Sequence, residues 1–398
     1  MSEINNIPVF MNNAGIICSL GNGLDAVADK LFSDTVQQHE HLKVSPAWEK
    51  YFPYPVGAVM EELPITPIAD EDSRCNRLLT EAINPLLPEI EALKTQFGPT
   101  RIAIVVGTST AGIAEAEIAV AAKQKTGQFT EGYHYRKQEL YAPSRYLSRW
   151  LGLQGPCFSV SSACTSGAKA LATAARLLKL GVCDAVIAGG VDTLCQMTLS
   201  GFDSLAVTTS GLCNPFSANR RGINIGEGAG IFLVTREPGP VRFMGSGESS
   251  DAHHISAPHP EGIGAELSMC EALQMAGIKP GDVDYLNFHG TATEQNDRME
   301  AHAAKRVLGS DIACGSTKGL TGHTLAAAGA IEAVFCWMTL QRDDGALPRH
   351  LWDGQSDTEL PVLGNLALRH HQGLVSVAMS NSFAFGGNNI SLLLARAT

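Results

Sequence analysis

CFSVSSACTSGAKALATAARLLKLGVCDAVIAGGV, residues 157–191, holds two short apolar runs on either side of a segment rich in alanine and leucine. The runs at 157–163 and 184–191 have the length and composition of buried strands. The segment at 165–181 consists of good helix formers and ends at a glycine, which predicts a helix. A strand, a helix and a second strand in this order are typical of an α/β protein whose sheets are covered on both faces.

The same arrangement recurs outside this stretch. Residues 101–109 (RIAIVVGTS) predict another buried strand, and in the second half of the chain a strand at 312–318, a helix at 322–341 and a strand at 376–385 follow one another. Strand, polar turn and alanine-rich helix therefore occur twice, which predicts a duplicated fold. Proline and charged residues interrupt the pattern near 235–243. We expect one half at 1–240 and the other at 241–398.

Composition narrows the class of protein. The chain has 398 residues, 44% of them hydrophobic and 17% charged, and a net charge of −11. These values predict a globular protein and argue against general nucleic-acid binding, which needs a basic surface. The ten cysteines are scattered without a C-x-x-C pair, which indicates buried, reduced thiols. No signal peptide and no long apolar run are evident, so we expect a soluble cytoplasmic protein.

Cys164 is the first candidate for chemistry. It stands in SSACTSGAKAL, between a predicted strand and a predicted helix. A thiol at a helix N-terminus is predicted to favour the thiolate, because free N–H groups and the helix dipole stabilise negative charge there. The alternative is a buried structural cysteine. The small residues on both sides leave room for a substrate and favour a nucleophile.

Two histidines are the next candidates. His289 stands in NFHGTATEQND, where Thr291 and Thr293 add hydroxyl groups for an extended polar substrate. A capping or core histidine is the alternative. His323 stands in STKGLTGHTLAAAGAIEA, just before a predicted helix.

Lys318 and Glu332 flank His323 in the sequence. A buried pair of this kind can fix proton positions, although it also occurs in purely structural networks. The segment NSFAFGGNN, residues 381–389, adds a glycine turn whose N–H groups could line an oxyanion hole.

Other motifs are excluded. GEGAG at 226–230 lacks the spacing of a dinucleotide-binding loop, and there is neither a P-loop nor a G-x-S-x-G elbow. His253, His254 and His259 have no metal-site spacing. We therefore predict no metal and no bound cofactor.

Together the motifs resemble those of the β-ketoacyl-acyl-carrier-protein synthases of the elongating, Cys-His-His type. The matching segments are SSACTSGAKAL, NFHGTATEQNDRMEA, STKGLTGHTLAAAGAIEA and NSFAFGGNN, with support from DAHHISAPHPEG and PFSANRRGINIGEGAG. They agree in order from about residue 8 to the end of the chain. The resemblance implies the thiolase-like fold, two duplicated α/β halves in a five-layer αβαβα arrangement, and a dimer.

The resemblance also implies an activity. The enzyme would carry out a decarboxylative Claisen condensation between an acyl thioester on a cysteine and malonyl-acyl carrier protein, in fatty-acid or polyketide-type chain elongation. The first half would carry the nucleophile, and the second half would carry both histidines and a phenylalanine gate. The implied roles are Cys164 as nucleophile, His289 and His323 as enolate-stabilising donors, Lys318 and Glu332 as organising residues, Thr291 and Thr293 as phosphopantetheine contacts, and Phe383 and Phe385 as gate, with the N–H groups of Cys164 and Phe385 as oxyanion hole.

Departures and alternatives remain. Ala384 replaces the glycine usual between the two gate phenylalanines, Phe288 places an aromatic ring beside a histidine, and Arg221 replaces an acidic residue. These changes suggest a specialised synthase of secondary metabolism, such as aryl polyene or polyketide assembly. A chain-length-factor subunit would have lost the nucleophile, and a coenzyme A thiolase would need a second active cysteine. Both stay as alternatives, as do a homodimer and a heterodimer with a related subunit.

An acidic carrier protein needs a basic docking patch on this acidic chain. The candidate pairs are Arg74 and Arg77, Arg136 and Lys137, Arg145 and Arg149, and Arg220 and Arg221.

Overall fold

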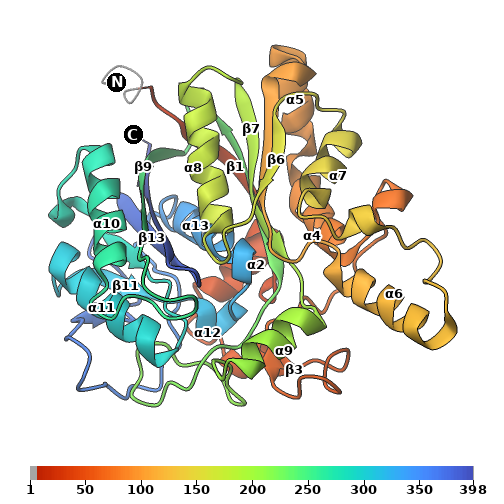
Figure 1. Cartoon of the computed structure of the whole chain (residues 1–398). Coiled ribbons are helices and arrows are strands. Elements are labelled where there is room, and N and C mark those ends of the chain that lie inside the picture. Colours follow the sequence, from red (N-terminus) through yellow and green to blue (C-terminus); the bar gives the residue numbers. More distant parts are fainter. Residues whose placement is uncertain (1–6, 398) are drawn as a thin grey trace.

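The structure is a computed structural model and describes residues 7–397 (Figure 1). The first half of the chain forms a five-stranded unit in which β5 lies between β6 and β7, parallel to both, and β8 runs antiparallel to β7 and β1. The spatial order is β6-β5-β7-β8-β1. The strands are β1 (Phe10–Cys18), β5 (Ile102–Gly107), β6 (Cys157–Val160), β7 (Ala185–Asp192) and β8 (Gly228–Thr235).

The second half repeats this topology. Its order is β11-β10-β13-β14-β9, and each neighbouring pair has the same relative direction as its counterpart in the first half. The strands are β9 (Val241–Ser250), β10 (Tyr285–Asn287), β11 (Ala313–Gly315), β13 (Val377–Phe383) and β14 (Asn388–Arg396), with the short β12 (Asn365–Leu366) added beside β11. A short β1–β9 ladder joins the two units. The predicted duplication is therefore visible in the order of the strands.

Two helices of small residues fill the space between the units. α8 (Ser166–Lys179) and α13 (Ala328–Thr339) pack against each other in the centre of the molecule. A Cβ on Gly167 would lie 2.8 Å from the carbonyl oxygen of Ala326, and one on Gly329 would lie 2.9 Å from the Cβ of Ala168. The glycines and alanines of both helices are thus needed for this close approach.

The outer faces are covered by further helices. α4 (Arg74–Ile83), α5 (Leu87–Phe97) and α7 (Ala142–Leu151) cover the first unit, and α10 (Ile263–Ala276) and α11 (Glu294–Leu308) cover the second. Helix, sheet, helix, sheet and helix follow one another, which confirms the predicted five-layer αβαβα fold (Figure 1).

The remaining elements lie around these layers. They are β2 (Gly21–Asn22), α2 (Leu24–Leu31), α3 (Gln38–His41), β3 (Lys43–Val44), β4 (Pro55–Val56), α6 (Ile113–Thr126), α9 (Gln196–Ser204) and α12 (Lys318–Thr321). Figure 1 shows α6 reaching outward from the body of the protein. Within residues 7–397, no helix combines the length and the apolar character that a membrane crossing requires.

Two predicted elements differ from the structure. β6 ends at Val160 and lies at the sheet edge, where its four residues are only partly buried. The predicted helix 322–341 begins only at Ala328, after α12 and a 3-10 turn at Leu325–Ala327. The reason is local, because Gly322 (φ 67°) and Leu325 (φ 51°) adopt left-handed conformations that no α-helix accepts.

Candidate active site

Cys164 lies in the connection between β6 and α8. The preceding residue, Ala163, has a φ of 52°, and this left-handed conformation turns the chain sharply before the helix begins at Ser166. Cys164 is 5% exposed. Its position just before the first helical turn is as predicted from the sequence.

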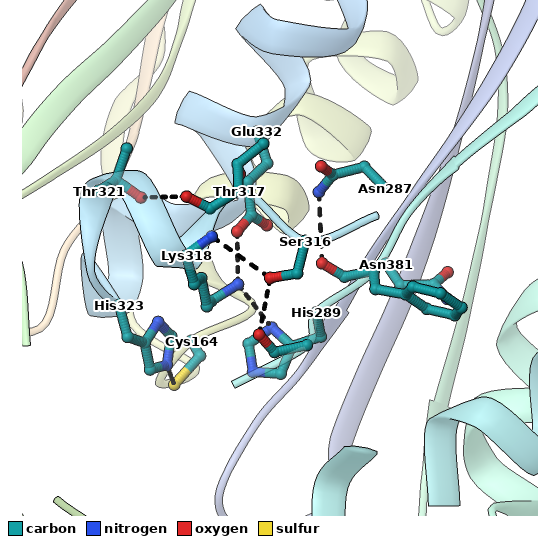
Figure 2. A network of polar contacts seen from close by, with 12 residues as sticks. Cys164, Asn287, His289, Ser316, Thr317, Lys318, Thr321, His323, Glu332 and Asn381 are labelled. Atoms are coloured by element: carbon teal, nitrogen blue, oxygen red, sulfur yellow. Dashed lines mark hydrogen bonds and ion pairs between the residues drawn. The ribbon is translucent and has the colours of Figure 1, made fainter. Parts of the chain in front are cut away.

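The structure brings both predicted histidines to Cys164 (Figure 2). Nε2 of His323 lies 3.1 Å from Sγ of Cys164, and the rings of His289 and His323 are 5.1 Å apart, nearly perpendicular. One potential ligand atom from each of the three residues lies within 4.8 Å of the others. In residues 7–397 no other group of three histidine, cysteine or carboxylate side chains gathers in this way, and the three histidines at 253–259 do not.

Lys318 and Glu332 form a fully buried ion pair beside the histidines. Nζ of Lys318 also lies 3.5 Å from Nδ1 of His289, and a dashed line marks this contact in Figure 2. A lysine ammonium can only donate, so Nδ1 of His289 acts as acceptor and the neutral ring carries its proton on Nε2. Burial raises the pKa of Glu332 to about 7, and the charge of Lys318 works against that rise.

Burial also decides the protonation of the other groups. It holds the pKa of both His289 and His323 well below the ordinary value, and the nearby Lys318 lowers both further. Both imidazoles are therefore neutral. Burial raises the pKa of the Cys164 thiol to about 12, although Lys318 and the backbone N–H groups of Cys164 and Phe385 lower it. Desolvation of Cys164 thus opposes the thiolate that the helix start was predicted to favour.

Glu300 of α11 supports the His289 segment, and the sequence reasoning missed it. Its carboxylate accepts hydrogen bonds from the backbone N–H groups of His289 (2.7 Å) and Gly290 (2.8 Å). The side-chain amides of Asn296 and Asn381 donate to it as well. Glu300 is fully buried, and burial raises its pKa to about 7.

The inner end of a cavity of about 530 Å³ is closed by Cys164, His289 and His323. Its wall includes Thr291 and Thr293, whose hydroxyl oxygens lie 2.9 Å apart. Arg221 also lines the cavity, and because it is exposed whereas Cys164 is buried, it marks the outer end. The hydroxyls therefore lie along a passage that an extended polar substrate could follow to the sulfur.

The two predicted gate phenylalanines line the same cavity. Phe383 lies 6.2 Å from the ring of His289, and the ring of Phe385 lies 5.6 Å from that of Phe202. Between them, Ala384 has an ordinary negative φ, while Gly386 (φ 84°) and Gly387 (φ 74°) make the turn. An alanine at 384 is therefore compatible with the conformation seen here.

One sequence-based expectation is wrong. The ring of Phe288 points away from the site, into the core of the second half, where it packs 4.5 Å from the ring of Phe216. The docking residues stay a prediction, and five of the eight candidates form ion pairs: Arg74 with Glu227, Arg77 with Asp72, Arg145 with Glu71 and Glu139, Arg149 with Asp70 and Glu71, and Arg220 with Asp357. These partners lie 5–153 residues away in the sequence, so most could not be foreseen.

Comparison with known proteins identifies the family. The β-ketoacyl synthase N-terminal domain matches residues 65–238, and the β-ketoacyl synthase C-terminal domain matches residues 242–351. Nodulation protein E of Rhizobium meliloti is 37% identical over 306 residues, which cover 73% of this chain and 75% of that protein. A 3-oxoacyl-[acyl-carrier-protein] synthase 2 of Rhizobium meliloti (strain 1021) is 40% identical over 266 residues, and the chain spans only 62% of its length.

A solved structure covers nearly the whole chain. The complex of the ketosynthase ApeO with its chain length factor ApeC from Xenorhabdus doucetiae contains a chain that is 41% identical. The match covers 98% of both chains with a TM-score of 0.91. Fold, motifs and sequence similarity agree from the first strand to the last, and the chain belongs to the β-ketoacyl synthase family.

Proposed function

We propose that the protein is an acyltransferase that condenses an acyl thioester, held on Cys164, with malonyl-acyl carrier protein. The products are a β-ketoacyl-acyl carrier protein and carbon dioxide. The observation that carries the proposal is the contact of Cys164 with His323, beside a neutral His289, at the inner end of a cavity with hydroxyl groups on its wall. A thiol, two neutral imidazoles and a passage for a long thioester are what this reaction requires.

The first step loads the acyl chain. His323 Nε2 takes the thiol proton from Cys164 across 3.1 Å, and Sγ attacks the carbonyl carbon of the incoming acyl thioester. The backbone N–H groups of Cys164 and Phe385, which lie against Sγ, stabilise the tetrahedral oxyanion. The carrier thiol then leaves with the proton from His323. No net proton is consumed, and the site is again neutral.

The second step generates the nucleophile. Loss of carbon dioxide from the malonyl group leaves its electron pair on the thioester as an enolate, and the Nε2–H group of His289 stabilises the enolate oxygen. His323 adds a second donor once its single proton has moved from Nδ1 to Nε2, the other neutral tautomer. Neutral imidazoles suit this task because they donate hydrogen bonds without readily protonating the carbanion. The carbanion attacks the acyl carbon on Cys164, a carbon–carbon bond forms, and the thiolate leaves and regains a proton from solvent. Lys318 and Glu332 hold the tautomer of His289 throughout.

Carrier-protein docking is also part of the proposal. Arg220 and Arg221 are the arginines that line the cavity, and Arg220 is buried in an ion pair with Asp357. Arg221 is exposed and, among residues 7–397, has no carboxylate within ion-pair distance. Its guanidinium is therefore positioned to meet the phosphate of a phosphopantetheine arm, while Thr291 and Thr293 contact the arm further in. No cofactor beyond that carried arm is proposed.

We further propose a dimer in which the exposed edge of β6 faces the partner. An open edge strand with unpaired backbone groups favours pairing with another chain. The partner is a second copy or a related subunit, and the complex of ApeO with its chain length factor supports the second choice. We also propose that the two halves divide at residue 240 and that the protein acts in secondary metabolism. A cytoplasmic location, which fits the ten unpaired cysteines, is part of the same proposal.

Mass spectrometry tests the proposal directly. The purified protein is incubated with an acyl-carrier substrate, and the peptide with Cys164 is examined for the acyl mass, while release of carbon dioxide from malonyl-carrier protein is measured in parallel. We expect the adduct, its absence in Cys164→Ala, and decarboxylation that survives in Cys164→Ala because both histidines remain. No adduct from any acyl-carrier substrate would favour a binding subunit instead.

A further inference from the structure

A second buried acid, Asp192, links two segments of the site. It is the last residue of β7 and has no exposed surface. Its carboxylate accepts six hydrogen bonds. Oδ1 accepts from Thr108 Oγ1 (2.9 Å), Ser109 N (2.8 Å), Thr110 N (2.9 Å) and Thr110 Oγ1 (2.9 Å), and Oδ2 accepts from Ser109 Oγ (2.5 Å) and Ala326 N (2.8 Å).

Both segments that Asp192 binds contain a strained residue. Ala111, directly after Thr110, has a φ of 44°, and Leu325, directly before Ala326, has a φ of 51°. Residues with a side chain rarely adopt this left-handed conformation, and it persists only where the surroundings enforce it. The bond from Ala326 N to Asp192 immediately follows Leu325, so it holds the strained turn in place.

This turn begins two residues after His323. The Nδ1 atom of His323 is buried and has no hydrogen-bond partner within residues 7–397, while Nε2 faces Cys164. The direction of the ring therefore depends on where the backbone puts it. On the upstream side the backbone is held, because His323 N donates to Asn224 O and Gly226 N donates to His323 O. On the downstream side the anchor is Asp192, through Ala326.

We propose that Asp192 is a positioning residue for His323: by fixing the turn that follows this histidine, it sets the contact between Nε2 and the sulfur of Cys164. Asp192 itself touches neither the sulfur nor the imidazole. The inference rests on the proposed function only where turnover is measured, because the contact it explains lies within the protein.

The hydrogen bonds of Asp192 form a clamp, with the Thr108–Thr110 segment on one side and Ala326 on the other. An asparagine at position 192 separates the two sides. The amide has one acceptor oxygen and one NH₂ group, which can only donate. The oxygen is best used in place of Oδ1, where two N–H groups and two hydroxyls converge. The NH₂ group then faces the N–H of Ala326, and two donors cannot bond. Asp192→Asn thus keeps the Thr108–Thr110 segment bound and releases the turn behind His323.

Alkylation of Cys164 by iodoacetamide is the primary measurement. The modified peptides are separated by mass spectrometry, and Cys270, exposed on α10, reports the reactivity of an ordinary thiol in the same sample. We expect Asp192→Asn to slow alkylation of Cys164 at pH 8 by about tenfold and to leave Cys270 unchanged, because small displacements of a catalytic contact have effects of this order. The kcat for malonyl-carrier decarboxylation should fall by a similar factor, with the KM nearly constant.

The direction of the change in alkylation rate distinguishes a displaced His323 from the mere loss of the Asp192 charge. The charge of Asp192 raises the pKa of the Cys164 thiol, so removing it without moving His323 would accelerate alkylation. Faster or unchanged alkylation with normal kcat would therefore overturn the proposal, even if the melting temperature fell.

Two control variants complete the design. Thr110→Val removes one hydroxyl from the other side of the clamp and should react like the wild type; slowing equal to that of Asp192→Asn would contradict the route through Ala326. Glu71→Gln neutralises another buried carboxylate, held by Arg145 and Arg149, and controls for lost stability. Slow alkylation in Asp192→Asn, with no decarboxylation in any variant or in the wild type, would refute the condensation but not the positioning.

Discussion

Replacing the buried Lys318–Glu332 pair separates what it does for the fold from what it does for the reaction. Both side chains are almost fully buried, with 1% and 3% of their surface exposed. Lys318→Met leaves the carboxylate of Glu332 without its partner, and breaking a buried pair in this way costs about 3–5 kcal/mol. Exchange of a whole buried pair for apolar residues of similar volume is often neutral or stabilising. The double variant Lys318→Met/Glu332→Leu should therefore recover most of the free energy of unfolding, measured by urea titration.

Activity should not recover with stability. In the double variant nothing donates to Nδ1 of His289, so the tautomer with its proton on Nε2 is no longer enforced. We expect decarboxylation of malonyl-carrier protein to fall by about 100-fold, which corresponds to about 2.7 kcal/mol of transition-state stabilisation. Lys318 also lowers the pKa of both histidines, so the acid side of the pH–rate profile should move to higher pH.

The outcome that would refute this reasoning is a double variant with wild-type decarboxylation and an unchanged pH profile. The pair would then serve folding alone, and the tautomer of His289 would be set by something else. Equal losses of stability in the single and the double variant would contradict the energetic part, because the double variant leaves no unpaired charge in the core.

Two other predictions concern the cavity mouth and the His289 segment. Arg221→Ala should raise the KM for carrier-borne or phosphopantetheine thioesters about tenfold but leave the KM for pantetheine thioesters, which lack the phosphate, unchanged; equal effects on both in steady-state assays would exclude phosphate recognition. Burial raises the pKa of Glu300 from 4.5 in the unfolded chain to about 7 in the folded protein. Between pH 4.5 and pH 7 the folded protein therefore binds more protons than the unfolded chain. Its stability falls as the pH rises through this range, by about 3 kcal/mol at most. Glu300→Gln should flatten that dependence in urea titrations at pH 5 and pH 8, and an identical slope in both proteins would contradict the assignment.

The reacting groups were accessible from the sequence because each sits in a short motif at the end of a predictable element. Cys164, His289 and His323 all follow a strand, and the turns after strands gather at one edge of the sheets. Their protonation was not accessible. The helix start was expected to favour the thiolate, but the depth at which Cys164 is buried depends on how both halves close around it, and local sequence does not contain that information.

The supporting carboxylates were missed for a related reason. Asp192 accepts hydrogen bonds from residues more than 80 positions earlier and 134 positions later in the sequence. Glu300 accepts from the His289 segment, and predicting this contact requires the orientation of α11 relative to that segment. A signal did exist at Asp192, a single acid at the end of an otherwise apolar strand, where an uncompensated charge would be costly. Phe288 shows the opposite error, since adjacency in sequence placed it beside His289 while the alternation of side chains sends it into the core.

The repeated strand order shows which unit contributes each reacting group to the site. The connection after β6 carries Cys164. The matching connection after β11, which includes α12, carries Lys318 and His323. Likewise, the turn after the second strand carries Thr108–Thr110 in one unit and His289 in the other. Equivalent connections of the two units thus supply different groups to one site, a thiol from the first unit and imidazoles from the second. The site is therefore built from both units, and neither unit by itself contains the thiol together with the two imidazoles.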